Sequence, residues 1–527
     1  MIILYKMPFI ILNRIAPFTL VIIISIIILF KTSYNASNLD ITPDSVEYAL
    51  GGNSIATEGS YSITVNRTDY PPRYPPWFSL LVIAPNYIII GNELGNAIYS
   101  ITLYAIFGIA IAFLIGTNIS GELGGILSAL GLLLIHNYRS LERQIMTDVP
   151  CFSLILLICY VYLILRRSTL INNLKLYSFA GILIGYCSAL RPTCVSTILP
   201  FIAISLFSKR VSTSLARLFC LLIPSLIVIG ANIIYNYYTF ISIIRNGYNF
   251  WCPVPYDYLS LTFSIKYVLA NLIQLILSLY VILLILAVIL WLRSSQIICN
   301  NYKYTKVIYK HFMEFIIVGV GPLIVFHLFY FFSNSRFYLP LTSILIVIVG
   351  SMLGIIFNNV DRRKYIVILF LVVLSAIAFR CIIYDAPPFK RKSIERILNH
   401  TPENSIILSS IDPAYLEYFI CRKSSRLVVP ISRSVEYASK LISYHVIKNP
   451  NPAPKSWKDH RCAGLIKGGA VEPIPYVAFE RPDIIADKIK EGFPVFIDTS
   501  FLERSDKERI ASLYEWFEFK KKDNQLY

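Results

Sequence analysis

Two carboxylates stand one helical turn apart in the segment 42–47 (TPDSVE). Proline is favoured in the first turn of a helix, so a short helix is expected to begin at Pro43. Asp44 and Glu47, at positions i and i+3, then share one face of that helix. Such a pair suits general-base catalysis, because one carboxylate accepts a proton while a neighbouring charge tunes its pKa. The alternative is that both acids only stabilise the positive end of the helix.

A proline-rich run follows at residues 71–77 (PPRYPPW). Prolines keep the backbone stiff and extended, so the run cannot cross a membrane and holds Arg73 rigidly. A guanidinium binds phosphate through a planar fork of donors. Arg73 is therefore a candidate for binding a lipid phosphate, with Arg67 as a second candidate. The alternative for Arg73 is an anchor whose charged end lies among the lipid headgroups.

A third acid, Asp148, stands just before Pro150 at the start of an apolar stretch. It is a candidate catalytic residue or, alternatively, an ordinary helix cap. Arg191 in the run LRPT and Arg336 in the run RFYLP stand beside apolar stretches in the same way. With Arg143 they are candidates for lining the mouth of one cavity, and Arg191 and Arg336 are also candidates for binding a lipid phosphate. The alternative is that each is a separate local anchor.

Aromatic side chains near these charges are candidates for substrate contact. They are Tyr70 and Tyr74 in the proline-rich segment and Trp251 in the aromatic loop 235–258. Tyrosine and tryptophan are also enriched at any membrane interface, which is the alternative. The 10 cysteines include no C-x-x-C pair and the 6 histidines form no ligand pair, so no metal site is predicted. His327 lies in the middle of an apolar stretch and is either functional or a packing residue.

The elements that position these residues are membrane helices. Of the 527 residues, 56% are hydrophobic and 15% are charged, whereas a soluble protein has roughly a quarter charged. A soluble enzyme is excluded. With about 20 apolar residues per span, we predict about eleven transmembrane helices, near residues 9–30, 93–115, 120–136, 150–165, 177–190, 193–208, 215–235, 266–292, 312–332, 338–357 and 365–384. The stretch 77–90 is short and Pro85 interrupts it, so a re-entrant or juxtamembrane helix is expected there.

The net charge of +17 is mainly a signal of membrane topology. Lysine and arginine are concentrated in alternate loops. One set of loops has 15 of them, and the other set has 9 although its loops are longer. The positive-inside rule makes the richer set cytoplasmic, which also removes the case for nucleic-acid binding. The N-terminus is then inside. Nine of the 12 acidic residues before residue 385 fall on the outer side, where chemistry is expected.

Two regions follow from this pattern. Residues 1–384 form the transmembrane region, with a first outer loop at 31–92. Residues 385–527 are expected to form an extracytoplasmic α/β domain, because short apolar runs (405–410, 426–430, 492–498) alternate there with helical patterns. No glycine-rich nucleotide motif follows any of these runs.

The order of the motifs resembles a known group of enzymes. An acid motif follows the first span, YPPRYP precedes the second, TDVP enters the fourth, LRPT separates the fifth and sixth, and RFYLP comes late in the bundle. The chain is similar to GT-C glycosyltransferases that use polyprenyl-phosphate sugars, the group with protein O-mannosyltransferases and the lipid A aminoarabinose transferase. The resemblance implies that Asp44 is the acid of the first-loop motif and Asp148 that of the second loop. Arg336 would contact the donor phosphate.

The resemblance also implies a reaction and partners. A sugar would pass from a polyprenyl-phosphate donor to an extracytoplasmic glycolipid, glycan or protein acceptor, in a multi-pass protein of the bacterial inner membrane. Ser45 stands where some families have a second acid beside the first, which weakens the case for a bridging metal. Whether a divalent metal takes part stays open. The alternative function is transport or flipping of lipid-linked sugars.

Overall fold

The computed structural model describes residues 17–30, 42–91, 93–166, 171, 173–206, 211–251, 256, 259–294, 302–357, 389–409, 414–420, 424–430, 466–467, 470–471, 487–499 and 511. They fall into two compact units. The helix bundle takes in the described residues of 1–36, 98–238 and 263–385. The loop-and-sheet unit takes in those of 37–97, 239–262 and 386–527. The predicted span 365–384 lies outside the described residues.

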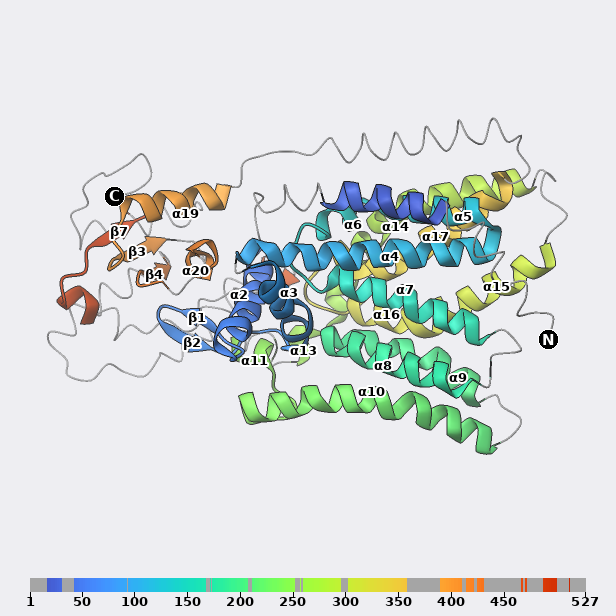
Figure 1. Ribbon diagram of the computed structural model, residues 1–527, viewed down its shortest axis with the longest axis horizontal. Coiled ribbons are helices and arrows are strands. Elements are labelled where there is room, and N and C mark those ends of the chain that lie inside the picture. Colours follow the sequence, from blue (N-terminus) through green and yellow to red (C-terminus); the bar gives the residue numbers. More distant parts are fainter. Residues whose placement is uncertain are drawn as a thin grey trace. The chain divides into compact units, whose positions relative to one another are not determined.

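The helix bundle consists of long apolar helices lying side by side (Figure 1). Its helices are Pro17–Phe30, α4 (Ile98–Ser120), α5 (Glu122–Leu134), α6 (His136–Leu141), α7 (Asp148–Leu165), α8 (Leu174–Leu190), α9 (Leu199–Leu206), α10 (Val211–Phe240), α14 (Val268–Ser294), α15 (Tyr302–Phe315), α16 (Gly321–Leu328) and α17 (Leu339–Phe357). Short turns of tighter or wider helix precede four of them, at η3 (Pro192–Ile198), η4 (Ile265–Tyr267), η5 (Ile316–Val320) and η6 (Ser335–Tyr338).

Five helices among the described residues are long and apolar enough to cross a membrane. They are Gly95–Ser120, Asp148–Leu165, Val211–Phe240, Val307–Leu328 and Ser335–Ile356. Shorter apolar helices lie at Pro17–Phe30, Glu122–Leu134, Leu174–Leu190, Pro192–Leu206 and Ile265–Tyr280. These helices support an integral membrane protein, while the count of about eleven spans and the orientation stay predictions.

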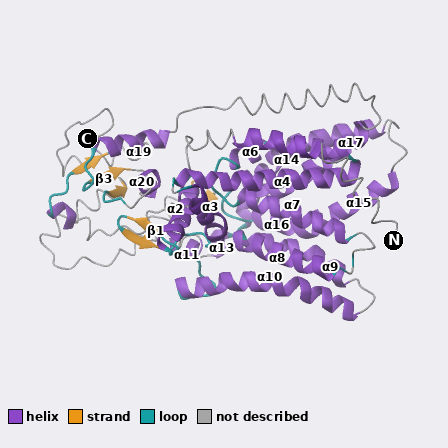
Figure 2. Cartoon of the chain, in the orientation of Figure 1, coloured by secondary structure: helices purple, strands orange, loops and turns teal. Residues whose placement is uncertain are grey.

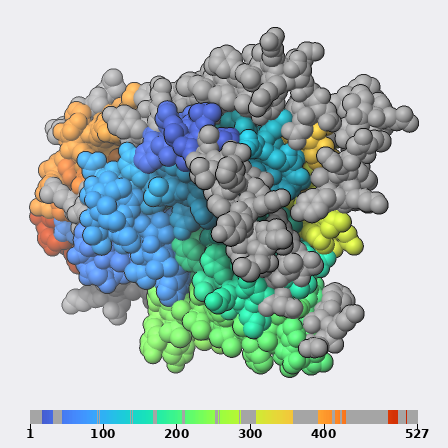
Figure 3. Space-filling view, turned by 45° about the vertical axis from the view of Figure 1, so that its right-hand side comes forward, coloured from blue at the N-terminus to red at the C-terminus, as the bar shows by residue number. Residues whose placement is uncertain are grey.

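Apolar side chains cover the outside of the bundle, as lipid contact requires. Helix α10, green in Figure 3, lies at the surface. Its Phe219 and Leu226 are each 60% exposed. In water so large an apolar patch would favour association. In a bilayer it faces hydrocarbon at no cost.

Small residues let α5 pack closely against α17. A Cβ added at Gly354 of α17 would lie 2.6 Å from the Cα of Gly124 in α5. Ser128 of α5 donates a hydrogen bond to the backbone oxygen of Val347 at 3.1 Å. Close backbone approach through small residues, with hydroxyl groups bridging helices, is how membrane helices associate without a hydrophobic driving force. These contacts fix the centre of the bundle.

The named strands of the described chain lie in the loop-and-sheet unit, and Figure 2 shows them in orange. Its first-loop elements are α2 (Pro43–Glu58), β1 (Ile63–Val65), β2 (Thr68–Tyr70), η1 (Ser79–Ile83), α3 (Ala84–Ile90) and η2 (Leu94–Ala97), followed by α11 (Gly247–Trp251) and α13 (Leu259–Thr262). Its C-terminal elements are α19 (Phe389–His400), β3 (Ile406–Ser409), α20 (Ala414–Ile420), β4 (Leu427–Pro430), β5 (Ile466–Lys467), β6 (Ala470–Val471) and β7 (Val495–Ile497).

Three of these strands form a parallel sheet in the order β4-β3-β7. Ile406 pairs with Leu427 on one side and with Val495 on the other. The strands coincide with the three short apolar runs at 405–410, 426–430 and 492–498. A parallel sheet needs crossover connections, and α20 lies in the one between β3 and β4. The boundary at residue 385 stays a prediction.

The first-loop hairpin joins this sheet through one asparagine. Asn66 and Arg67 at its tip have positive φ angles of 50° and 66°, as a tight two-residue hairpin turn requires. The Asn66 side-chain amide donates to the backbone oxygen of Val428 at 2.9 Å, and the Val428 N–H donates back to Asn66 Oδ1 at 2.8 Å. The amide thus satisfies the backbone of β4 as a neighbouring strand would.

The stretch around Pro85 differs from the prediction. Pro85 does not interrupt the helix, because η1 continues directly into α3 and the proline stands in the first turn of α3. The helix changes from the wider π-type turn of η1 to the α-type just before Pro85, the residue that lacks a backbone N–H donor. Whether this helix is re-entrant or juxtamembrane stays a prediction.

The close approach of α5 and α17 makes a test of the bundle. We expect Gly354→Ala to lower the free energy of unfolding by about 1–3 kcal/mol, because the new Cβ meets backbone that must shift. Gly230→Ala is the matched control: a Cβ there meets nothing within 4 Å, so only the gain in helix propensity of about 1 kcal/mol remains. Thermal unfolding in detergent measures both. Equal stability of the two variants would contradict this packing.

Candidate functional site

Helix α2 begins where the sequence predicts. Thr42 caps it: the Thr42 Oγ1 accepts from the Ser45 N–H at 3.3 Å and lies 2.8 Å from the Ser45 hydroxyl. Pro43 occupies the first turn and Asp44 follows it, near the positive end of the helix. The helix ends at Gly59, whose φ of 69° suits glycine. Asp44 and Glu47 are thereby fixed on one face.

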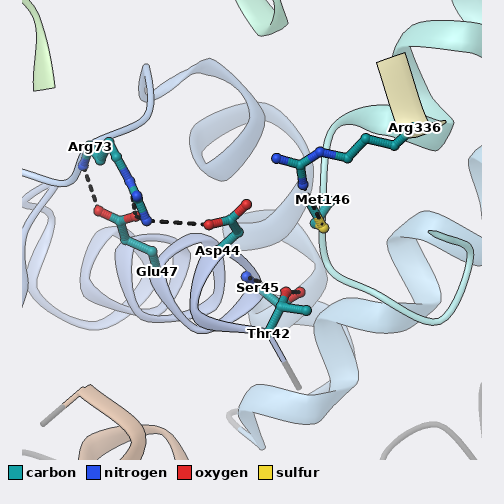
Figure 4. Close-up of polar contacts among 7 residues, drawn as sticks. All are labelled: Thr42, Asp44, Ser45, Glu47, Arg73, Met146 and Arg336. Carbon is teal, nitrogen blue, oxygen red and sulfur yellow. Dashed lines mark hydrogen bonds and ion pairs between the residues drawn. The ribbon is translucent and has the colours of Figure 1, made fainter. Parts of the chain in front are cut away.

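A buried guanidinium lies between these two carboxylates (Figure 4). Arg73 donates its backbone N–H to Glu47 Oε1 at 2.7 Å, and its Nε and Nη2 to Glu47 Oε2 at 3.2 and 3.0 Å. The same Nη2 donates to Asp44 Oδ1 at 3.3 Å. The side chains of Glu47, Arg73 and Asp44 are 0%, 7% and 21% exposed. Glu47 is therefore a buried counterion, and Asp44 is the more accessible acid.

The proline-rich run holds Arg73 in this position. Its backbone passes so close to α11 that a Cβ at Gly247 would lie 2.3 Å from the Arg73 backbone oxygen. Tyr74 stacks on Tyr48 of α2 with ring centres 4.2 Å apart and meets Tyr248 edge-on at 5.6 Å. The Arg73 guanidinium lies 5.1 Å from the centre of the Tyr74 ring. Tyr74, which the sequence predicts as a substrate contact, is thus buried among the aromatic side chains that support Arg73.

Burial changes the pKa values of Glu47 and Tyr74. Burial raises the pKa of Glu47, and the Arg73 charge and its hydrogen bonds offset only part of that rise. Burial also raises the pKa of Tyr74 well above the usual range of tyrosine. Tyr74 is therefore neutral, and Glu47 binds a proton more readily than an exposed glutamate.

Arg67 lies at the hairpin tip and contacts the C-terminal sheet. Its Nε donates to the backbone oxygen of Ser425 at 3.1 Å and its Nη2 to Asn404 Oδ1 at 3.2 Å. This placement favours a structural role over phosphate binding. Tyr70, at the end of β2, is half-buried with its ring 6.5 Å from that of Phe250. The side chain of Trp251 lies outside the described residues.

In the helix bundle, Asp148 pairs with Arg191. Asp148 stands in the first turn of α7, and its Oδ1 accepts from Arg191 Nη2 at 2.6 Å. Its side chain is 1% exposed, and within the described residues its Oδ2 has no hydrogen-bond partner. Arg191 ends α8 and is followed by the Pro192 turn. Asp148 therefore holds Arg191 in place, which goes beyond the simple cap that was the alternative.

The ring of Phe337 packs against three ionisable side chains of the helix bundle. The guanidinium carbons of Arg191 and Arg336 lie 5.6 and 5.3 Å from its ring centre. The imidazole of His327 stacks flat on the same ring at 4.3 Å. His327 is 4% exposed, and neither of its ring nitrogens has a hydrogen-bond partner among the described residues. Arg336 Nη1 also lies 3.8 Å from the Met146 sulfur (Figure 4).

The fold also brings together three cysteines for which the sequence predicts no common site. The sulfurs of Cys151, Cys187 and Cys194 all lie within 4.8 Å of one another, and all three residues are buried. Their positions in the sequence, in two helices and a turn, carry no metal-binding spacing. The signal that could have found them is their register: each stands three or four residues from Asp148 or Arg191, on the same side of its helix or turn.

Comparison with known proteins gives a fold. No family model matches the sequence, and no curated protein matches it. The crystal structure of ArnT from Cupriavidus metallidurans bound to undecaprenyl phosphate is similar with TM-score 0.53 and 10% identity, covering 80% of this chain and 90% of that one. Its apo state gives TM-score 0.53 and 11% identity over the same shares of the two chains.

A third solved structure is more distant. The archaeal oligosaccharyltransferase AglB from Archaeoglobus fulgidus, in complex with an inhibitory peptide and a dolichol-phosphate, has TM-score 0.44 and 13% identity, covering 79% of this chain and 64% of that one. The similarity to ArnT, a GT-C superfamily member, shows that this chain has the ArnT fold. The resemblance to GT-C proteins drawn from the order of motifs is thereby confirmed at the level of the fold.

The buried ion cluster of the first loop makes a stability test. We expect Glu47→Ala to lower the free energy of unfolding by about 3–5 kcal/mol, because it leaves the buried Arg73 guanidinium with one partial counterion in place of two. Glu58→Ala, at the exposed end of the same helix, should change it by less than about 0.5 kcal/mol. Thermal and denaturant unfolding in detergent measure both. Similar losses in the two variants would show that the cluster does not support the first loop.

Proposed function

We propose that the chain is an integral-membrane glycosyltransferase that moves a sugar from a polyprenyl-phosphate donor to an extracytoplasmic glycolipid, glycan or protein. The observation that carries the proposal is a partly exposed acid, Asp44, held against a buried guanidinium in a chain with the ArnT fold. ArnT itself has been crystallised with undecaprenyl phosphate. The ligand of that relative supports a lipid-phosphate donor for this chain.

In the proposed reaction, Asp44 acts as the general base. An acceptor hydroxyl or amine attacks the anomeric carbon of the sugar, its proton passes to Asp44, and the bond from that carbon to the lipid phosphate oxygen breaks. A single displacement inverts the anomeric configuration. The Arg73 guanidinium, 3.3 Å from Asp44 Oδ1, balances the negative charge of this carboxylate. Glu47 is buried, so its role is to hold Arg73.

The proposed phosphate ligands are Arg191 and Arg336. Negative charge builds up on the departing phosphate, and fixed guanidinium groups in a site of low dielectric stabilise it well. Asp148 acts through Arg191 and is therefore a positioning residue. It orients the guanidinium by a 2.6 Å bond to one nitrogen, which leaves the remaining donors of Arg191 for another anion. Both arginines pack on Phe337, which limits their rotamers.

A divalent metal does not fit the carboxylate pair of α2. Both Glu47 oxygens accept hydrogen bonds from Arg73, and Asp44 shares the same guanidinium. A hard cation needs several free oxygen ligands around one point. Here Arg73 already supplies the positive charge to both carboxylates. No step of the proposed reaction passes through a metal at this place.

Replacement of Asp44 tests the proposed reaction. We expect Asp44→Asn to lower sugar transfer by about 10²–10⁴-fold, because the amide cannot accept the proton. Binding of undecaprenyl phosphate should be retained, since the lipid phosphate is assigned to other residues. The measurements are transfer from undecaprenyl-phosphate sugars to cell-envelope acceptors, and lipid binding by native mass spectrometry.

Asp69→Asn is the matched control, because Asp69 is an exposed acid of the same unit that accepts from Thr64 at 2.7 Å. It should leave transfer unchanged. Near-normal turnover of Asp44→Asn would remove Asp44 from the role of base. Movement of intact lipid-linked sugar across vesicles without any transfer would favour the alternative, a flippase.

The raised pKa of Glu47 predicts a pH dependence of stability. The folded state binds a proton at Glu47 more readily than the unfolded chain, so this group stabilises the fold fully below the usual glutamate pKa, and that stability is lost as pH rises through the raised value. Glu47→Gln cannot titrate. The stability of wild type relative to Glu47→Gln should therefore increase as pH falls between those two values, in thermal unfolding. A difference that stays constant or decreases on acidification would contradict the assigned burial.

A further inference from the structure

Three buried thiols meet at one point of the helix bundle. Cys151 belongs to α7, Cys187 to α8 and Cys194 to η3. Their exposed fractions are 1%, 0% and 0%, and their sulfurs lie within 4.8 Å of one another. The two further cysteines in the described bundle, Cys159 and Cys220, are outside this group. One point shared by three sulfurs from three elements is the geometry of a ligand set.

The ion pair of Asp148 and Arg191 lies next to this point and fixes its three elements. Cys151 is three residues after Asp148, on the same side of α7. The Arg191 N–H donates to the Cys187 oxygen at 2.9 Å, and the Cys194 N–H donates to the Arg191 oxygen at 2.9 Å. The positions of all three thiols are therefore tied to the two residues that form the ion pair.

The chemistry of the group selects a soft metal ion. Thiolates prefer soft ions such as Cu(I) and Zn(II). Structural zinc sites are almost always tetrahedral with four ligands, and within the described part of the chain no histidine, aspartate or glutamate joins the three cysteines. Three sulfurs in a dry site suit the lower coordination number of Cu(I). The single positive charge of Cu(I) offsets one of the three thiolate charges that the site buries.

We propose that Cys151, Cys187 and Cys194 bind one Cu(I) ion that links α7, α8 and η3 beneath the Asp148–Arg191 pair. The thiols release their protons to solvent on binding, because the thiolate is the ligand. No change of copper oxidation state is involved. The site has a positioning role. It fixes the start of α7, whose first residue is Asp148, and the end of α8, which Arg191 follows directly.

The test uses the full-length protein in detergent, reduced, freed of metal and titrated with Cu(I) in competition with a chromogenic Cu(I) chelator. We expect stoichiometric binding to wild type and loss of that binding in Cys151→Ser, Cys187→Ser and Cys194→Ser. Cys159→Ser is the matched control: Cys159 is a buried cysteine two turns further along α7, and its loss should leave binding unchanged. Copper should raise the melting temperature of wild type and of this control only.

X-ray absorption at the copper edge of the wild-type protein gives a second reading that needs no variant. We expect sulfur ligands alone. Nitrogen or oxygen ligation, equal copper binding by the triple serine variant, or a native disulfide within the group shown by mass spectrometry would each overturn the proposal. Because these readings measure binding and not sugar transfer, failure of the copper site leaves the proposed function standing, and the reverse also holds.

Discussion

The first loop depends on one buried guanidinium. Arg73 is 7% exposed and would be very costly to bury alone, but three hydrogen bonds to Glu47 and one to Asp44 compensate it. This requirement explains the local sequence. The prolines stiffen the backbone that carries Arg73, Gly247 leaves room for it, and Thr42 and Pro43 fix the start of the helix that carries both acids. The result is a charged cluster in which only the Asp44 carboxylate is partly exposed.

The helix bundle contains a second charge pair under a similar constraint. Asp148 and Arg191 lie at the ends of α7 and α8, where apolar helices give way to turns, and the buried Asp148 carboxylate needs the Arg191 guanidinium as its counterion. Phe337 packs against Arg191, Arg336 and His327, so one aromatic ring limits the freedom of three ionisable side chains. Close contacts between small residues in α5 and α17 stabilise another part of the bundle.

Local features of the sequence predicted local structure well. The run TPDSVE predicted both the start of α2 at Pro43 and the shared face of Asp44 and Glu47, because caps and helical spacing act over a few residues. The order of motifs predicted the ArnT fold. Pairing between distant residues could not be predicted in this way. Nothing in the sequence connects Arg73 with Glu47, Asp148 with Arg191, or Arg67 with Ser425. The spacing of the three cysteines from Asp148 and Arg191 points to one site only once that ion pair is known. Tertiary packing alone brings these partners together, and the roles that we propose for Glu47, Arg67 and Asp148 rest on it.

The proposed function requires that the arginines of the helix bundle bind a lipid phosphate and that α2 carries the base. An electron cryo-microscopy structure of the full-length protein in nanodiscs with undecaprenyl phosphate tests it most directly. We expect density for the phosphate within hydrogen-bonding distance of the guanidinium groups of Arg191 or Arg336, with Asp44 still bound to Arg73. A phosphate bound elsewhere, with both guanidinium groups in contact only with Asp148 and aromatic rings, would contradict it.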